Sequence, residues 1–324
     1  MDTQSLHRDA IIFDGHCDTL LEIQEGNWKL GERSERGHVD LPRLTEGGVT
    51  AQIFALYIAP EYLPARATWQ ALRLIDLFQR EAEANADRLL LATRAADIEE
   101  AKRRGKVAGV LGLEGAEALE GDLGVLRLLY QLGLRNVGIT WNFRNQAADG
   151  LGEKRTGGGL TEFGVKLIEE LNRLGVMVDV AHLAPAGVRD VLAISQGPVV
   201  ASHANAYAVC PHQRNLTDEQ LEGIARSGGV VGVTFVASFV AEDKEQATLA
   251  KLLDHVDHIV KVAGIDHVGL GSDFDGYEEG VREIKDAASL PLITLGMAER
   301  GYSEEDIRKF LGGNWLRVFR QIVG

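Results

Sequence analysis

Eight short apolar runs recur along this 324-residue chain and alternate with amphipathic segments, a pattern that restricts the possible folds strongly. The runs are rich in β-branched residues and cover 10–16, 49–58, 107–115, 135–141, 176–182, 198–203, 229–235 and 267–274. Apolar strands that alternate with helices are typical of a parallel sheet whose outer face is covered. Eight such units favour a (β/α)8 barrel of the TIM type, with an open doubly wound sheet as the alternative.

Five of the intervening segments carry the signals of helices. They cover 68–86, 161–175, 185–195, 217–228 and 303–323. The second segment opens on Thr161 and closes on Gly175, a typical N-cap residue and a typical C-terminal glycine. The last segment contains the pair Gly312 and Gly313, which we expect to break or kink the helix because glycine is a poor helix former.

Composition gives no sign of a second domain or of a membrane segment. No linker or low-complexity tract divides the chain, so we expect residues 1–324 to form one barrel domain. The net charge of −14 argues against nucleic acid or an anionic membrane surface as a partner. The chain has only two cysteines and no apolar run of about 18 residues, so neither a disulfide framework nor a membrane span is predicted. We therefore expect a cytoplasmic protein.

Ionisable residues stand at the predicted carboxyl ends of the strands, where apolar strands do not usually finish. They are His16, Asp18, Glu114, His182, His203 and Asp273. In a barrel all the carboxyl ends meet at one mouth, so these side chains should lie together. Because side chains alternate along a strand, His16 and Asp18 should face one way and Cys17 the other.

Three imidazoles and three carboxylates are more ligands than one zinc ion needs, since a catalytic zinc typically takes three from the protein. The set fits two metal ions that share a carboxylate. We expect His16 and Asp18 to hold one ion, His182 and His203 the other, and Glu114 to bridge them. Each residue also has a simpler explanation, such as a structural histidine or a capping carboxylate. Six such coincidences are less economical than one metal site.

The remaining histidines show no ligand spacing. His255, His258 and His267 lie in helical or strand contexts that need no function, and we expect His7 and His38 to be exposed or in loops. Two connections, 19–48 and 142–160, are unusually long. In a barrel both would lie over the catalytic face, where long loops often act as lids or specificity elements.

Motifs along nearly the whole chain give it a resemblance to a known family. These stretches are DGHCDTL (14–20), VDLPRLTEGGVTAQIFALY (39–57), GLEGAEAL (112–119), GVLRLLYQLGLRNVGITWN (124–142), DVAHL (179–183), SHANAYAVCPHQRNLTDEQ (202–220), HVGLGSDFDG (267–276) and GGNWLRVF (312–319). In this order they resemble the renal, or membrane, dipeptidase family, the M19 metallopeptidases of the amidohydrolase-like barrels. The resemblance implies a TIM-type barrel that hydrolyses dipeptides, including some with a C-terminal D-residue, with two zinc ions per chain. It also implies that a homodimer can form.

The resemblance assigns roles to individual residues. The family's zinc ligands fall on His16, Asp18, Glu114, His182 and His203, with Glu114 as the bridge. Its acid/base carboxylate falls on Asp273, and the arginine that recognises the substrate's terminal carboxylate falls on Arg214. Trp141 stands where mammalian members carry a substrate-binding histidine, so we expect Trp141 to contact substrate in another way. An indole N–H can donate a hydrogen bond but cannot ionise.

Two other functions remain open from the sequence. A metal-dependent enzyme with the same ligands could hydrolyse a lactam, a lactone or another cyclic amide instead of a dipeptide. A barrel that has lost catalysis could serve as a binding protein, although the intact set of ligand residues argues against this. A panel of substrates distinguishes the first alternative, and zinc content without hydrolysis would indicate the second.

Overall fold

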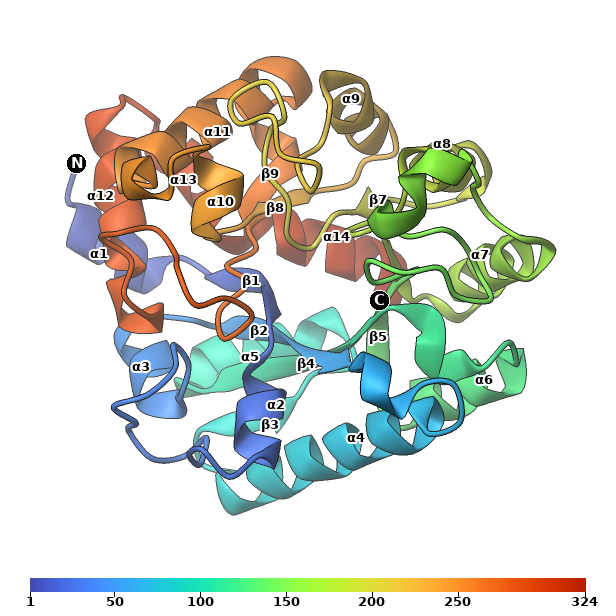
Figure 1. The fold of residues 1–324 in the computed structure, drawn as a ribbon. Helices are drawn as coiled ribbons and strands as arrows, with labels where there is room; N and C mark the ends of the chain where they lie inside the picture. The colour runs from blue at the N-terminus through green and yellow to red at the C-terminus, as the bar shows by residue number, and fades with distance from the viewer.

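Eight parallel strands surround a barrel in the computed structural model, which describes all residues from 1 to 324 (Figure 1). Their order around the wall is β7-β6-β5-β4-β2-β1-β9-β8, and a bridge between Ala201 and Val231 closes the ring. The strands are β1 (Phe13–Cys17), β2 (Ala51–Tyr57), β4 (Val107–Glu114), β5 (Leu134–Gly138), β6 (Met177–Asp179), β7 (Val199–Val200), β8 (Val231–Val233) and β9 (Val268–Leu270). The predicted TIM-type barrel is confirmed, and each predicted run contains one barrel strand.

A ninth strand, β3 (Leu89–Leu91), was not predicted. It pairs with β4 outside the ring, Leu89 opposite Val107 and Leu91 opposite Gly109. A run of three leucines is too short to show a strand period, and leucine is not enriched in strands as valine and isoleucine are. Its pairing depends on the neighbouring edge of β4, a contact that local sequence does not encode.

Four predicted helices are present with bounds within two residues of those expected. They are α4 (Ala67–Ala84), α7 (Glu162–Leu174), α8 (Pro185–Ile194) and α9 (Asp218–Arg226). At the start of α7, Thr161 accepts a hydrogen bond from the N–H of Gly164, and Gly175 ends the helix with a left-handed φ of 72°. Both capping predictions are therefore confirmed.

The last predicted helix is divided as expected. The chain forms α13 (Glu304–Arg308), a wide turn over Lys309–Gly313, and α14 (Asn314–Val323). Gly312 leaves the helical conformation, and a side chain there would meet the carbonyl oxygen of Ile11 and the amide nitrogen of Phe13, each at 2.6 Å. The kink therefore lets the C-terminal segment pack directly against the start of β1.

The other helices cover the barrel or lie in its connections. They are α1 (Thr3–Asp9), α2 (Thr19–Gln24), α3 (Leu41–Glu46), α5 (Ala95–Arg104), α6 (Leu123–Gln131), α10 (Ala237–Val240), α11 (Leu249–Ala263) and α12 (Pro291–Glu299). The main core of 72 buried residues includes residues of the barrel wall and of the helices around it. No helix is both long enough and apolar enough to cross a lipid bilayer.

One end of the barrel is closed by α14, which contacts β1, β6 and β9 and crosses behind the strands in Figure 1. Trp315 is fully buried there and packs against Phe13, with ring centroids 5.8 Å apart. The indole N–H of Trp315 donates to the carbonyl oxygen of Leu270 at 2.8 Å. Because this end is filled, the opposite end, where the strands finish, is the one available for a site.

His7 does not have the exposed position that we expected. It is buried on α1, with Nδ1 2.6 Å from Thr294 Oγ1 and Nε2 2.9 Å from the carbonyl oxygen of Gly47. The helix is amphipathic only over two turns, so its inner face could not be recognised from the sequence. His7 therefore has a structural role that joins α1 to α12 and to the end of α3.

Candidate metal centre

The six ionisable residues predicted at the strand ends lie together at the open end of the barrel. His16 is within β1 and Glu114 is the last residue of β4. Asp18 precedes α2, so it stands just outside β1. The other three lie in the loops that follow β6, β7 and β9, and the prediction that their strands end on them was wrong: His182, His203 and Asp273. The strands are shorter than the apolar runs because the last residues of these runs turn into loops.

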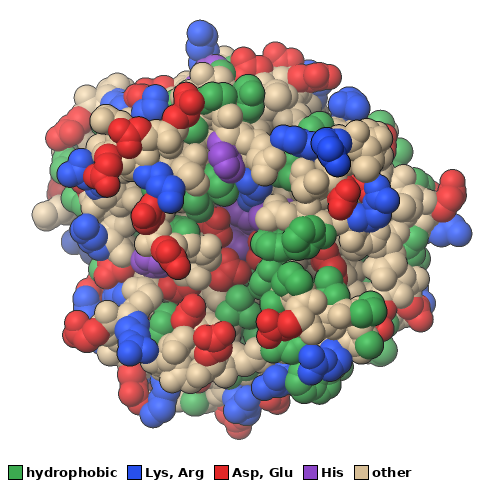
Figure 2. All heavy atoms as spheres, viewed as in Figure 1, with side chains coloured by type: hydrophobic (Ala, Val, Ile, Leu, Met, Phe, Trp, Pro, Cys, Tyr) green, Lys and Arg blue, Asp and Glu red, His purple; other side chains and the backbone are tan.

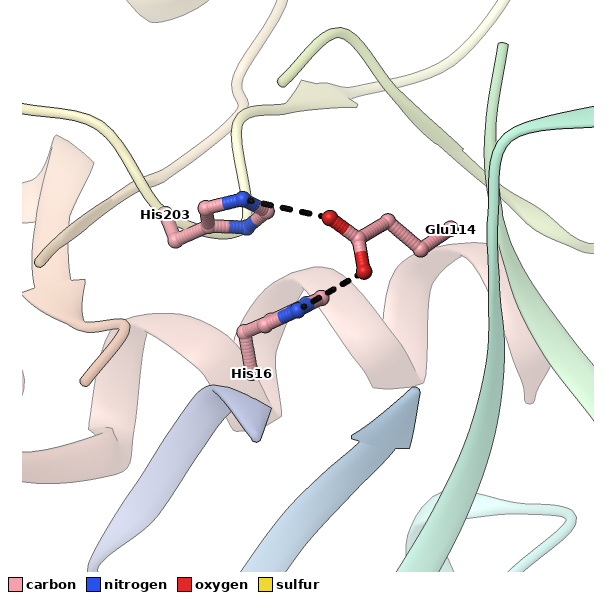
Figure 3. Close-up of side chains that lie close together, drawn as sticks. All are labelled: His16, Glu114 and His203. Atoms are coloured by element: carbon pink, nitrogen blue, oxygen red, sulfur yellow. Dashed lines mark ion pairs between the residues drawn. The ribbon is translucent and has the colours of Figure 1, made fainter. Parts of the chain in front are cut away.

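Glu114 is the residue that joins the two halves of the cluster (Figure 3). Its Oε2 lies 3.5 Å from His16 Nε2. Its Oε1 lies 3.0 Å from His182 Nε2 and 3.8 Å from His203 Nε2. The two oxygens of one carboxylate therefore face different histidines, as the prediction of a bridging residue requires.

The ring of His16 is surrounded by carboxylates. Its Nε2 lies 3.4 Å from Asp18 Oδ2 and 3.9 Å from Asp273 Oδ1, yet this buried nitrogen has no hydrogen-bond partner. Cys17, the residue between His16 and Asp18, is fully buried in the main core. The predicted alternation therefore holds, with His16 and Asp18 on the side of the mouth.

The histidine nitrogens are oriented as metal ligands would be. His182 Nδ1 donates to Asn142 Oδ1 at 2.8 Å, so Nε2 carries the lone pair and points toward His203 Nε2, 2.9 Å away. A ligating histidine commonly donates its other ring N–H to an oxygen in this way. Two groups of ligand atoms lie close enough to hold a cation, one of His16, Glu114 and His203 and one of His16, Asp18 and Asp273. The residues present therefore fit a metal centre.

Electrostatics in the cluster also favour a bound cation. Burial raises the pKa of Asp18 well above its usual range, and the charge of Glu114 adds to this. Burial would lower the pKa of His16, but Glu114 and Asp18 hold it well above its usual range. Burial lowers the pKa of His182 to about 4. Three carboxylates crowded around one imidazolium repel one another, and a divalent cation would relieve this repulsion.

A cavity of about 390 Å³ opens onto the cluster. Six of the predicted site residues line it: Asp18, Glu114, Trp141, His182, Arg214 and Asp273. The long connections 19–48 and 142–160 contribute Leu21 and Asn142 to its wall. Figure 2 shows histidine and acidic side chains at the centre of this face, with hydrophobic side chains beside them. The volume is at the lower end of the range for small-molecule sites, about 300–1,000 Å³.

An aromatic wall forms one side of the cavity. Trp141 packs edge-on against Tyr57, with ring centroids 5.1 Å apart, and against Phe143 at 5.3 Å. Tyr57 ends β2 and is the partner of Glu114 in the parallel register. Sequence reasoning did not single out Tyr57 or Asn142. A tyrosine at the carboxyl end of a predicted strand was the one signal that could have identified Tyr57.

Arg214 is buried in the cavity wall without a carboxylate partner. It is 5% exposed, and its Nε has no hydrogen-bond partner. Its Nη2 donates to the carbonyl oxygen of His203 at 3.1 Å, and its guanidinium lies 5.4 Å from the ring centroid of Phe239. Arginines are almost never buried unless they are paired, so this one is arranged to receive an anion. By itself the sequence showed only an arginine in a loop.

Comparison with known proteins gives one consistent result. The family model for membrane dipeptidase, peptidase family M19, matches residues 1–323. The chain is 35% identical over 327 residues to dipeptidase tcpJ of Claviceps purpurea strain 20.1, covering 95% of this chain and 76% of that protein. It superposes on the crystal structure of dipeptidase AC, a metallopeptidase of family M19, with a TM-score of 0.91 and 36% identity, covering 97% and 99% of the two chains. A metallopeptidase from Rhodobacter sphaeroides, solved with a phosphinate mimic of the dipeptide L-Ala-D-Ala, has a TM-score of 0.88 and 36% identity over the same shares.

Proposed function

Because the chain belongs to the membrane dipeptidase family, peptidase family M19, we propose that its metal centre holds two zinc ions and hydrolyses dipeptides, including those with a C-terminal D-residue. Family membership makes the protein a dipeptidase of the metallohydrolase class. One observation carries the proposal for the substrate. The unpaired guanidinium of Arg214 and the ligand-type side chains line the same small cavity, so a short peptide with a free carboxylate fits both ends.

The ligand residues divide into two pairs. We assign one zinc ion to His16 and Asp18, the other to His182 and His203, and both to Glu114. The separate orientation of the two Glu114 oxygens supports this division. When bound, zinc ions polarise a carbonyl oxygen and lower the pKa of water from 15.7 to about 7.

Three residues of the chain would act on the substrate directly. Arg214 would bind the terminal carboxylate through the N–H groups that have no protein partner, which limits the substrate to a short peptide. Asp273, which lines the cavity, would accept the proton of the attacking water at its carboxylate and return it to the leaving amine. Trp141, held between Tyr57 and Phe143, would contact an apolar part of the substrate and exclude water.

Tolerance of a D-residue is supported by one relative. The Rhodobacter sphaeroides enzyme was solved with a mimic of L-Ala-D-Ala, and it is 36% identical to this chain over nearly its whole length. We extend this to the present protein as part of the proposal. Action of residues 1–324 as one catalytic unit, homodimer formation and a cytoplasmic location stay predictions.

The experiment is a substrate panel on zinc-loaded protein. It includes L,L-dipeptides, L-Ala-D-Ala, the same dipeptides with an amidated C-terminus, and a set of lactams and lactones. We expect hydrolysis of the free dipeptides, its loss on chelation and its return with zinc. Hydrolysis of lactams or lactones without hydrolysis of any dipeptide would contradict the proposal.

The role of Arg214 is tested on the same panel. Arg214→Lys keeps the charge but not the planar pair of donors, and Arg214→Ala removes both. We expect Arg214→Ala to lower kcat/KM for free dipeptides by about 100-fold, in line with a charge-assisted hydrogen bond of about 1.5–3 kcal/mol. Amidated dipeptides should lose much less. An equal loss for free and amidated substrates would show that Arg214 does not bind the carboxylate.

A further inference from the structure

Two carboxylates inside the barrel, below the predicted zinc ligands, have no part in the proposed reaction. Asp14 is 0% exposed and Asp179 is 3% exposed. A buried charge is costly unless it is well hydrogen-bonded. Both of these carboxylates accept hydrogen bonds from uncharged groups instead of a basic side chain. Their location therefore calls for an explanation.

Asp179 joins the two loops that carry a pair of predicted ligands. Its Oδ1 accepts the N–H of Ala181 at 3.0 Å and the N–H of Ser202 at 2.9 Å. Ala181 directly precedes His182, and Ser202 directly precedes His203. One oxygen atom therefore fixes the backbone in front of both histidines. The second oxygen accepts from Asn136 Nδ2 at 3.2 Å, which holds the carboxylate itself in place.

Asp14 makes the corresponding contact on the other side of the mouth. Its Oδ1 accepts the N–H of Ser272 at 2.7 Å, and its Oδ2 accepts the hydroxyl of the same serine at 2.6 Å. Ser272 directly precedes Asp273, and Asp14 lies two residues before His16 on the same strand. The N–H of Asp273 donates to the carbonyl oxygen of His16 at 3.2 Å. Asp14 therefore ties the loop of Asp273 to the strand of His16.

The loops need such restraint because their backbone is strained. His182 has a φ of 66° and Asp273 a φ of 65°, in the left-handed region that residues other than glycine seldom adopt. Conformations of this kind cost about 1–3 kcal/mol and persist only where the surroundings hold them. A carboxylate that accepts backbone N–H groups forms charge-assisted hydrogen bonds, about twice as strong as neutral ones.

We propose that Asp179 is a positioning residue that sets the separation of His182 and His203 for metal binding, and that Asp14 does the same for His16 and Asp273. The inference rests on the proposed function, because it requires that these histidines hold metal. It predicts that each carboxylate affects the metal through the backbone and without touching it.

The test compares Asp179→Ala and Asp179→Asn with the control Asp97→Ala. Asp97 lies on α5 and its Oδ2 also accepts two backbone N–H groups, from Thr93 at 2.9 Å and Arg94 at 3.1 Å. For each protein we would measure zinc affinity by competition with a chelator, the absorption spectrum with Co²⁺ in place of zinc, and the Tm of the metal-free protein. The control separates loss of a capped carboxylate from loss of the positioning contact.

We expect Asp179→Ala to weaken the binding of one zinc ion by about 10–100-fold, the usual effect of losing a group that orients a ligand, and to shift the Co²⁺ spectrum. Asp179→Asn should lose less, because its amide oxygen can accept the same two N–H groups. Asp97→Ala should lower Tm while leaving affinity and spectrum unchanged.

Wild-type affinity and an unchanged spectrum in Asp179→Ala would overturn the inference. If that variant does not fold, the same result in Asp179→Asn and Asp14→Asn would overturn it. Failure of the wild-type protein to bind zinc would instead contradict the proposed function, so the two failures can be told apart.

Discussion

Two buried histidines in different regions, His182 at the mouth and His255 on α11, share their burial and their electrostatics but differ in what their ring nitrogens face. Burial lowers the pKa of each to about 4. His255 Nε2 donates to the carbonyl oxygen of Val240 at 2.9 Å, and its Nδ1 accepts the N–H of Ala206 at 3.1 Å. Both of its nitrogens are thus satisfied by backbone groups. His255 joins α11 to α10 and to the loop after β7.

His182 uses only one nitrogen in this way. Its Nδ1 donates to Asn142, and its Nε2 faces His203 and Glu114. His7 repeats the pattern of His255, since both its nitrogens lie next to oxygens of the protein. Neither burial nor a lowered pKa therefore distinguishes a predicted ligand from a structural histidine. The distinguishing feature is a ring nitrogen that points at other metal-ligand atoms.

The comparison is tested most strongly by His182→Asn. Loss of a predicted zinc ligand should lower kcat/KM for a dipeptide by about 10³-fold, because a metal ion supplies several kcal/mol of transition-state stabilisation. The metal-free variant should unfold at nearly the same urea concentration as the metal-free wild type. Activity within tenfold of wild type would remove His182 from the ligand set.

His255→Ala should have the opposite profile. It leaves the carbonyl of Val240 and the N–H of Ala206 buried without partners, at about 1–3 kcal/mol for each group. We expect the free energy of unfolding to fall by about 3 kcal/mol in urea titration. Zinc content and kcat/KM of the folded protein should stay at wild-type values, and loss of zinc would break the distinction between the two regions.

The response to pH sharpens the same contrast. His255 is held neutral in the folded state with a pKa of about 4, whereas an unfolded histidine has a pKa of about 6.5. The unfolded state therefore binds the proton first, so stability is complete above pH 6.5 and is lost as pH falls toward 4. Between pH 7.5 and 5 this histidine should account for about 2 kcal/mol of lost stability.

His255→Gln provides the control for the pH prediction. Measured on metal-free protein, its loss of unfolding free energy between pH 7.5 and 5 should be smaller than that of wild type by about 2 kcal/mol. The other titrating groups contribute to both proteins and cancel in the difference. Equal losses would mean that His255 is not held neutral by its burial.

Asn142→Ala should give the smallest effect of the four. It removes the oxygen that accepts His182 Nδ1–H and so frees the ring to rotate. We expect zinc affinity to fall by about tenfold, at the lower end of the effect of losing such a partner. Asn142→Asp, which keeps an oxygen at the same place, should retain wild-type affinity. No change in Asn142→Ala would show that the ring is held by packing alone.

Much of the architecture was predictable because it is written in local patterns. Apolar runs such as 107–115 indicated strands, and the caps of α7 marked both of its ends. The short strand β3 and the buried face of α1 escaped, since three leucines and two helical turns carry too little periodicity. In these elements the structure depends on a neighbour that is distant in the chain.

The candidate site divides in the same way. The sequence by itself determined which residues are available, because metal ligands must be histidines or carboxylates and these stand out at the ends of apolar runs. Only the tertiary structure decided that Glu114 has one oxygen toward each half of the cluster and that Arg214 is buried without a partner. It also brought Asp179 under two ligand loops. The physical reason is that orientation and solvation of a side chain depend on contacts between distant strands, which local periodicity does not record.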